Sequence, residues 1–284
     1  MYKDGRWARE ILALQRPDGL WGPFHTLSEP RINVLSTEQA LRRLRILGYT
    51  IEDAPIQQAL DGLHGYLAGT RPIPDRREKT IDWDIYLQLM PAAWITLFTD
   101  KDELANTVAS KWAGLATAAF AGGSFDEDAY FSAYAREFSH RPAHGRTQDL
   151  CHFYIAAILR NRLETLIARA FFHHLLHHHA GIYYMCPGPL ITPPADFCSK
   201  EASRYLGALE LLSEYKDPAC REQLRFAADW LLAHRDANGE WDMGAAAKDG
   251  VYFPLSDSWR FPDDRKRDCT YRIRAFLSKV APEA

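Results

Sequence analysis

The chain has 284 residues, of which 47% are hydrophobic and 25% are charged, values close to those of globular proteins. This composition excludes an intrinsically disordered chain, a collagen and a low-complexity scaffold. The 34 Lys and Arg residues against 37 Asp and Glu give a net charge of -3, which excludes a global field that favours nucleic acid or an anionic membrane. We therefore expect a folded protein with no nucleic-acid partner.

The cysteines and the apolar stretches bear on location. Five cysteines without dense spacing predict free thiols, and the first residues contain no apolar signal stretch, so we expect a cytoplasmic protein. The longest stretch without Asp, Glu, Lys or Arg runs from Ala170 through Pro194. It is interrupted by histidines and prolines, so no membrane-spanning segment is expected.

Helical signals begin at Ser36. Ser36 and Gln39 have the spacing of a capping box, and Leu44 and Leu47 follow at helical spacing before Gly48. This pattern predicts a complete helix with a defined start and end.

A second helix follows, and the pair is repeated near the other end of the chain. Asp53 is expected to cap a helix that begins at Pro55. Residues 199–212 predict another helix, and Asp217 and Pro218 open the next one. A shift of 164 positions aligns Asp53 with Asp217 together with the apolar stripes behind them, which indicates duplicated helical hairpins.

Segments of helical length alternate with turn-rich stretches between the two hairpins. We expect these helices at residues 83–98, 103–121, 127–138 and 148–179. Few stretches have the alternation or the β-branched content of strands. The chain is therefore predicted to be all-α, with its helices paired in sequence order in one domain over residues 1–284. A single closed ring of hairpins would explain this length.

The strongest motif is a turn that occurs near both ends of the chain. Residues 15–21 read Gln-Arg-Pro-Asp-Gly-Leu-Trp, and residues 235–241 read Arg-Asp-Ala-Asn-Gly-Glu-Trp. Asp-Gly and Asn-Gly tolerate the left-handed conformation that ends a helix. The Trp that follows is then available to pack against the next helix, so both turns are expected to staple neighbouring helices together.

The first of these turns resembles the QW repeat, Gln-x-x-Asp-Gly-x-Trp, of squalene and hopene cyclases and of protein prenyltransferase β subunits. The second copy keeps Gly239 and Trp241 but has Arg235 and Asn238 in place of Gln and Asp. The resemblance implies an (α/α) toroid, a double ring of helices around a central cavity that binds an isoprenoid-like or other apolar ligand. It also implies cyclase-like or transferase-like chemistry, with a partner subunit or a homodimer as the assembly to look for.

Asp82 and Asp84 flank Trp83 at the start of an apolar predicted helix. A carboxyl pair in which burial and a charged neighbour raise one pKa supplies a general acid, and an adjacent aromatic face stabilises a cation. The segment resembles the Asp-x-Asp-Asp motif of squalene-hopene-type cyclases, in which an Asp protonates an alkene or an epoxide, but Ile85 stands at its fourth position. The alternative is that both acids cap the helix or favour its dipole.

The segment from Trp259 to Tyr271 combines a dense run of charges with aromatic residues before the last predicted helix. Trp259, Arg265 and Tyr271 are candidate ligand-binding residues, because basic side chains clamp phosphates and carboxylates. In prenyltransferase β subunits a similarly placed basic stretch binds diphosphate, and nearby Asp and Cys residues ligate zinc. Here Asp268 and Cys269 are adjacent, instead of being separated by one residue or more. The alternative is a solvated loop whose opposite charges pair with each other.

A histidine cluster at residues 173–179 is the other candidate metal site. His173 with His177, and His174 with His178, lie one helical turn apart, a spacing at which two imidazoles can share a metal. The alternative is a set of cations near the negative end of a helix. We assign no metal ligands and expect no cofactor.

Aromatic residues make up 12% of the chain, and several lie on segments expected to face inward. Aromatic walls suit a hydrophobic ligand, although large helices also need large core residues. The candidate ligand-binding residues among them are Trp83, Tyr86 and Trp94, and Trp112, Tyr130, Phe131 and Tyr134 lie on similar segments.

Three functions follow as alternatives. The first is a toroid that binds an isoprenoid-like ligand, with acid catalysis by Asp82 and Asp84. The second is a carbohydrate-active enzyme on a similar (α/α) barrel, in which paired carboxylates hydrolyse a glycosidic bond and tryptophans stack on a sugar-like ligand. The third is a binding or interaction module without catalysis.

Overall fold

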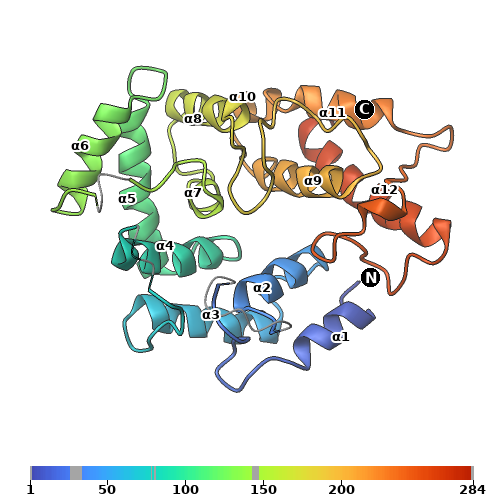
Figure 1. Cartoon of the computed structure of the whole chain (residues 1–284), viewed down its shortest axis with the longest axis horizontal. Helices are drawn as coiled ribbons and strands as arrows, with labels where there is room; N and C mark the ends of the chain where they lie inside the picture. Colours follow the sequence, from blue (N-terminus) through green and yellow to red (C-terminus); the bar gives the residue numbers. More distant parts are fainter. Residues whose placement is uncertain (1, 26–33, 78, 80, 143–146, 283–284) are drawn as a thin grey trace. The chain divides into compact units, whose positions relative to one another are not determined.

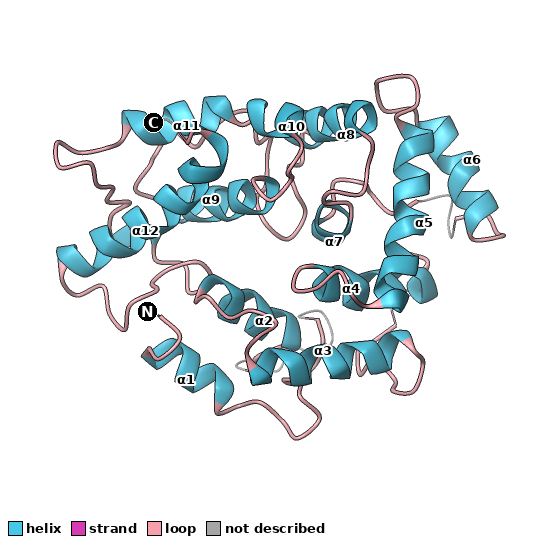
Figure 2. Ribbon diagram, turned by 180° about the vertical axis from the view of Figure 1, so that it is seen from behind, coloured by secondary structure: helices cyan, strands magenta, loops and turns pink. Residues whose placement is uncertain are grey.

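The computed structural model describes residues 2–25, 34–77, 79, 81–142 and 147–282. In this part of the chain every extended regular element is helical, and β pairing is confined to two isolated bridges, so the all-α prediction is confirmed (Figure 1 and Figure 2). The helices are α1 (Arg6–Leu12), α2 (Thr37–Ile46), α3 (Ala54–Leu67), α4 (Trp83–Thr96), α5 (Glu103–Ala119), α6 (Glu127–Glu137), α7 (Phe153–Ile158), α8 (Thr165–His177), α9 (Lys200–Leu212), α10 (Pro218–Glu222), α11 (Arg225–Ala233), η2 (Ala245–Ala247) and α12 (Pro262–Val280).

The chain divides into two compact units. Unit 1 comprises residues 1–115, 128–149 and 157–159, and unit 2 comprises residues 116–127, 150–156 and 160–284. The expectation of a single domain stays a prediction. None of the helices in the described residues combines the length and the apolar character that a membrane crossing requires.

In unit 1, the helix predicted after Ser36 is present as α2. The Ser36 hydroxyl accepts a hydrogen bond from the Gln39 N–H at 3.2 Å, and Gln39 Oε1 accepts one from the Ser36 N–H at 3.0 Å, so the capping box is confirmed. α3 begins directly after Asp53, as predicted. The Asp53 carboxylate does not cap that helix, because it accepts hydrogen bonds from the Lys3 ammonium and the Thr50 N–H instead.

Helices α3 and α4 pack against each other and lie side by side in Figure 1. α4 continues through Pro91, and its apolar side chains are buried on more than one face. Contacts of this kind remove apolar surface from water and supply most of the favourable free energy of folding. The largest fully buried side chains of unit 1 are Trp21, Phe24, Trp94, Trp112, Tyr130 and Tyr134.

The Gly-Trp turn at residues 15–21 staples α1 to α2. The Trp21 indole Nε1–H donates to the Ile11 carbonyl oxygen at 2.8 Å, which ties the ring to the end of α1. The Trp21 backbone N–H donates to the hydroxyl of Thr37, the first residue of α2, at 3.0 Å. Trp21 is fully buried, so both hydrogen bonds form away from water.

The turn at residues 235–241 in unit 2 repeats this arrangement. The Trp241 Nε1–H donates to the Leu231 carbonyl oxygen at 2.6 Å, and the Trp241 N–H donates to the Thr270 hydroxyl at 3.0 Å. In both units the Trp reaches back ten residues to a helix-end carbonyl and forward to a threonine on a following helix. The predicted staple between neighbouring helices is therefore confirmed within each unit.

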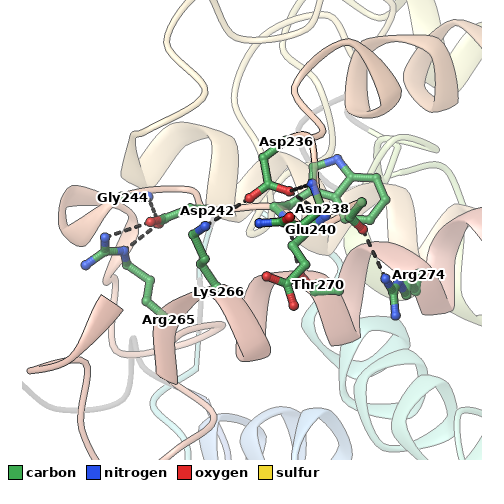
Figure 3. Close-up of polar contacts among 11 residues, drawn as sticks. Asp236, Asn238, Glu240, Asp242, Gly244, Arg265, Lys266, Thr270 and Arg274 are labelled. Carbon is green, nitrogen blue, oxygen red and sulfur yellow. Dashed lines mark hydrogen bonds and ion pairs between the residues drawn. The ribbon is translucent and has the colours of Figure 1, made fainter. Parts of the chain in front are cut away.

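The two turns differ in the side chain that braces them. In the first turn, Gln15 Nε2 donates to the Pro55 carbonyl oxygen of α3 at 2.8 Å. In the second turn, the Asp236 carboxylate accepts the N–H of Asn238 and of Glu240, both at 2.9 Å, and pairs with Lys266 of α12 at 2.9 Å (Figure 3). The ion pair of Asp236 with Lys266 thus takes the place of the Gln15 amide hydrogen bond in the turn that lacks Gln.

We expect Trp21→Phe to lower the free energy of unfolding by about 1 kcal/mol, because phenylalanine keeps most of the buried ring and loses the indole donor. The loss is modest because the Ile11 carbonyl keeps a second hydrogen bond from the Leu14 N–H. Trp241→Phe should behave alike, since the Leu231 carbonyl keeps one from the His234 N–H. Urea denaturation followed by circular dichroism measures both variants, and a loss above 3 kcal/mol would contradict this account of the indole bond.

The helix expected over residues 148–179 is not continuous, and this prediction was wrong. The chain is helical in α7 and again in α8, and between them Asn161 has a left-handed φ of 57° that ends the helical path. The Asn161 side chain is bonded to the segment after α9: its Oδ1 accepts from the Lys216 N–H at 2.6 Å, and its Nδ2 donates to the Glu214 carbonyl at 3.2 Å. These contacts, distant in sequence, decide the break.

The helix expected from Asp217 is also divided, into α10 and α11. Between them Leu224 has φ −93° and ψ 1°, and its N–H donates to the Arg221 carbonyl three residues back, so the chain tightens for one turn. The predicted apolar stripe survives the break, because Leu224, Ala228 and Leu231 are all buried.

The charge run after Trp259 is helical from Pro262 onward, so placing it before the last helix was wrong. α12 begins at Pro262, whose fixed φ suits the first position of a helix, and Asp263 and Asp264 occupy the favourable first turn. Arg267 pairs with Asp264 one turn away at 2.5 Å. Arg267 thus pairs within the segment, whereas Arg265 and Lys266 pair with Asp242 and Asp236, which lie outside it.

Unit 2 has its own apolar core around α8, α9, α11 and α12. All five cysteines are free thiols and belong to this unit, and four of them are buried while Cys198 is exposed. The largest fully buried side chains of unit 2 are Phe120, Phe171, Phe172, Tyr154, Tyr205 and Tyr215.

Candidate functional site

The candidate residues from the sequence fall into different units. Asp82, Trp83, Asp84, Tyr86 and Trp94 belong to unit 1, all on α4 or at its start. The remaining three, Trp259, Arg265 and Tyr271, belong to unit 2. The two sets therefore form separate candidate sites.

The structure separates the two carboxylates of α4. Asp82 is the residue that precedes the helix, and its side chain is only 11% exposed. Asp84 lies in the first turn with its side chain 78% exposed, and its carboxylate pairs with Arg77 at 3.5 Å. One acid therefore faces the protein and the other faces solvent. Of the two acids, only Asp82 has its carboxylate shielded from water.

Two side chains from outside α4 meet the Asp82 carboxylate. The Tyr134 hydroxyl of α6 donates to Oδ2 at 2.8 Å, and His140 Nε2 lies 3.2 Å from Oδ1. Asp82 does not cap α4 with its side chain, so the simple capping role expected as the alternative is absent for this residue. Asp82, Tyr134 and His140 together are called the Asp82 cluster below.

Tyr134 is a buried donor set among aromatic rings. Its ring lies 4.7 Å from that of Phe138, 6.3 Å from that of Trp112 and 6.2 Å from that of Tyr130, measured between centroids. Burial, and then the hydrogen bond to Asp82, raise the pKa of the Tyr134 phenol far above its usual value. Tyr134 therefore keeps its proton and holds one oxygen of the carboxylate in place.

His140 is the solvent-facing member of the cluster, with its side chain 46% exposed. Its Nδ1 lies 3.0 Å from the Phe138 carbonyl oxygen, two residues back. The hydrogen bond with that carbonyl, followed by the one with Asp82, raises the pKa of the imidazole. Ser139, between them, has a left-handed φ of 57°, which turns the chain after α6 so that His140 returns toward α4.

The predicted aromatic residues of α4 are buried. Trp83 and Tyr86 lie with ring centroids 5.8 Å apart beside Asp82, at 8% and 6% exposure. Trp94 lies deeper, where its Nε1–H donates to the buried Glu38 carboxylate at 3.2 Å. The structure thus places two aromatic faces near the start of the helix and uses the third in the core.

In unit 2, Arg265 is committed to an internal ion pair. Its guanidinium contacts both Asp242 carboxylate oxygens, at 2.5 Å and 2.7 Å, and the two side chains are about one-fifth exposed (Figure 3). Burial raises the pKa of Asp242, but the hydrogen bonds from Arg265 and from the Gly244 N–H, together with the charges of Arg265 and Lys266, outweigh it, and the net pKa is lowered. The positive charge of Arg265 is therefore largely balanced within the protein.

Asp268 organises the loop before α12. It is fully buried, and its Oδ2 accepts hydrogen bonds from the Leu255 and Ser256 N–H groups and from the Trp259 indole, at 2.7 to 2.8 Å. Burial raises the pKa of the neighbouring Cys269 thiol to about 12, which favours its protonated form. Trp259 is a partner of Asp268, whereas Tyr271 is about half exposed.

The histidine cluster at the end of α8 is a stack of imidazoles. The His173 and His177 rings lie 4.0 Å apart and nearly parallel, and His177 Nδ1 lies 2.9 Å from the His173 carbonyl oxygen. Burial, followed by the charge of His177, lowers the pKa of His173. His174 packs its ring against Phe120 and Phe125 instead.

Comparison with known proteins finds no matching family, curated protein or solved structure. The Asp82 cluster is therefore interpreted from its own chemistry. Its carboxylate is mostly shielded from water, one oxygen is fixed by a phenol and the other faces an imidazole that exchanges protons with solvent. Such an arrangement can store a proton and move it between solvent and a bound molecule.

Proposed function

We propose that the chain is an (α/α) toroid of the terpenoid-cyclase and prenyltransferase class, which binds an apolar, isoprenoid-like molecule and uses Asp82 as its proton donor. The observation that carries this proposal is the Asp82 cluster, a shielded carboxylate held by Tyr134 and contacted by His140. Asp84, with its exposed side chain, takes no part in the proposed step.

The proposed step is a proton transfer. Protonated Asp82 gives its proton to one carbon of an alkene, or to the oxygen of an epoxide; the π bond or the C–O bond breaks and a carbocation forms. Asp82 becomes a carboxylate, and the cation closes a ring before it loses a proton or takes up water. His140, which is in contact with both solvent and Oδ1, returns a proton to Asp82.

Two further features support this proposal. Trp83 and Tyr86 lie beside the start of α4, and aromatic faces attract a developing cation. The two Gly-Trp turns hold helix ends through the same indole and threonine contacts, as expected for a repeated staple in a ring of helices. A glycosidase on a similar barrel would need two cooperating carboxylates, and the opposite settings of Asp82 and Asp84 disfavour that alternative.

We expect Asp82→Asn to reduce isoprenoid cyclisation by about 10² to 10⁴-fold, the usual contribution of a general acid, and Asp84→Asn to leave it within about twofold. The assay uses C15 and C30 isoprenoid alkenes and their terminal epoxides in D₂O, with products analysed by mass spectrometry. A proton-initiated cyclisation of an alkene places one deuterium from solvent on carbon, so the product mass rises by that single atom.

Asp84→Asn is the matched control, because it removes the same charge from the same helix turn. Equal turnover by the two variants would refute Asp82 as the acid. Tight binding of the isoprenoids with no turnover would instead identify a binding module, and turnover without solvent deuterium in the alkene products would exclude proton initiation.

A further inference from the structure

His140 faces a hydrogen-bond acceptor at each of its two ring nitrogens. Nδ1 lies 3.0 Å from the Phe138 carbonyl oxygen, and Nε2 lies 3.2 Å from the Asp82 carboxylate. A neutral imidazole carries one N–H, so it can donate to only one of these acceptors, whereas an imidazolium donates to both. Both contacts are therefore hydrogen bonds at the same time only when the ring is protonated.

We propose that His140 is a proton-operated latch, which fastens the end of α6 to the carboxylate at the start of α4 when it is protonated and releases one of the two contacts when it loses the proton. The latch spans Glu137, where α6 ends, and Trp83, where α4 begins. It concerns the site of the proposed function, but it is a property of the chain that needs no ligand.

The charges around His140 favour this role. Asp82 is the charged group that acts on the imidazole, and Tyr134, from α6, meets the other oxygen of that carboxylate. Glu137, the last residue of α6, lies 3.9 Å from Lys111 of α5. The raised pKa of His140 agrees with a protonated ring that is stabilised by both acceptors.

The sign of the pH dependence follows from linkage. Because the pKa of His140 is raised by folding, its contribution to stability is fully present below the ordinary histidine pKa near 6.5 and is lost as the pH rises through the folded-state pKa. Release of the latch is therefore expected on the alkaline side of that value. The left-handed Ser139 is the residue at which the released segment can turn away.

His64 provides a matched comparison in the same unit. Its side chain is 48% exposed, against 46% for His140, and its Nδ1 lies 2.6 Å from Asp102. The structure gives the His64 ring this one acceptor, which a neutral imidazole satisfies with its single N–H. Protonation of His64 is thus not required to make its contact.

The experiment is a pH series on the ligand-free protein. NMR titration of histidine-labelled protein should give a pKa for His140 above 6.5, and Asp82→Asn should lower it. Hydrogen exchange of the amides at residues 137–140, corrected for intrinsic rates, should show protection that falls severalfold as the pH passes the His140 pKa. His140→Gln should remove this pH dependence, because glutamine does not titrate, and His64→Gln should leave it intact.

Two results would overturn the latch: protection in the native chain that does not change with pH, or a fall that persists in His140→Gln. Both variants change half-exposed side chains, so they test the contact in a folded protein. If the native chain shows the expected pH-dependent protection but Asp82→Asn still cyclises isoprenoids fully, the proposed acid is rejected and the latch is kept. If the native chain shows no pH-dependent protection but its turnover depends on Asp82, the latch is rejected and the proposed acid is kept.

Discussion

Replacing Gly19 with alanine is expected to lower the free energy of unfolding by about 3 to 5 kcal/mol, through two costs that act together. Gly19 has a left-handed φ of 83°, which an alanine adopts only with strain. A Cβ on Gly19 would also lie 2.2 Å from the Gln58 backbone oxygen and 2.6 Å from its carbonyl carbon. Gln58 is inside α3, so neither atom can move away without distorting that helix.

Gly69→Ala is the matched control for the clash. Gly69 is also in unit 1, follows the same helix and has a left-handed φ of 69°, but a Cβ there would meet no atom within 4 Å. We expect it to lose only the conformational cost, about 1 to 2 kcal/mol. Urea denaturation followed by circular dichroism measures both variants, and equal losses would show that the approach to Gln58 is not tight in solution.

The second Gly-Trp turn provides an internal comparison. Gly239 has a left-handed φ of 75°, and the nearest atom to an added Cβ is a guanidinium nitrogen of Arg274 at 4.0 Å. The loss in free energy of unfolding caused by Gly239→Ala should therefore be closer to that of Gly69→Ala than to that of Gly19→Ala. The two turns have the same backbone form, yet only the first is pressed against a neighbouring backbone.

Replacing Glu210 with alanine is expected to destabilise the protein by about 3 kcal/mol, because it leaves a buried guanidinium without its carboxylate. Arg272 of α12 contacts both Glu210 oxygens of α9, at 2.8 Å and 2.5 Å, and its side chain is only 3% exposed. The guanidinium also stacks on the Phe253 ring, 4.4 Å from its centroid. Water cannot replace the lost partner at this depth, although the 26% exposure of Glu210 holds the loss near the lower end of the range.

Glu222→Ala is the control for the loss of a glutamate from a helix of unit 2. Glu222 pairs with Arg225 on the surface, where both side chains are more than 60% exposed, so we expect a change within about 0.5 kcal/mol. The double variant Glu210→Leu with Arg272→Met removes both buried charges and should recover stability to within about 1 kcal/mol of the native chain. A double variant no better than Glu210→Ala would show that the stabilisation comes from other contacts of Arg272.

The features that the sequence predicted correctly are local ones. The capping box of Ser36 and Gln39, the helix starts after Asp53 and Ser199 and the indole bonds of the two Gly-Trp turns to a helix-end carbonyl all join residues within ten positions of one another. Short-range hydrogen bonding and backbone preference decide such features, so their patterns are visible in the sequence.

The features that the sequence could not predict depend on contacts across the chain. Asn161 ends a helical path by bonding to residues 214 and 216, and no local pattern marks it as a stop. Tyr134 was visible as an aromatic residue on an inner segment, but its bond to Asp82 spans 52 positions and that of His140 spans 58. Likewise, no pattern in the sequence indicated that Asp242 would pair with Arg265 and balance its charge.

The pair of acids at the start of α4 shows how far the sequence argument goes. The motif predicted two carboxylates next to an aromatic residue, and the structure contains them. Asp82 precedes the helix and is 11% exposed, whereas Asp84 in the first turn is 78% exposed, so the two do not share one shielded setting. α6 carries Tyr134, and the turn after it carries His140. Their contacts with Asp82 make that residue, and not Asp84, the shielded acid.

The threonine contacts of the two tryptophans have a consequence for how this chain can change. Trp21 reaches a threonine 16 positions on, whereas Trp241 reaches one 29 positions on, with the same atoms bonded at the same distance. A hydrogen bond between a turn and a later helix holds that helix in place whatever the length of the segment that connects them. The connection after such a tryptophan can therefore lengthen or shorten by insertion and deletion while the helices keep their register, which makes it the natural place for new sequence to enter the fold.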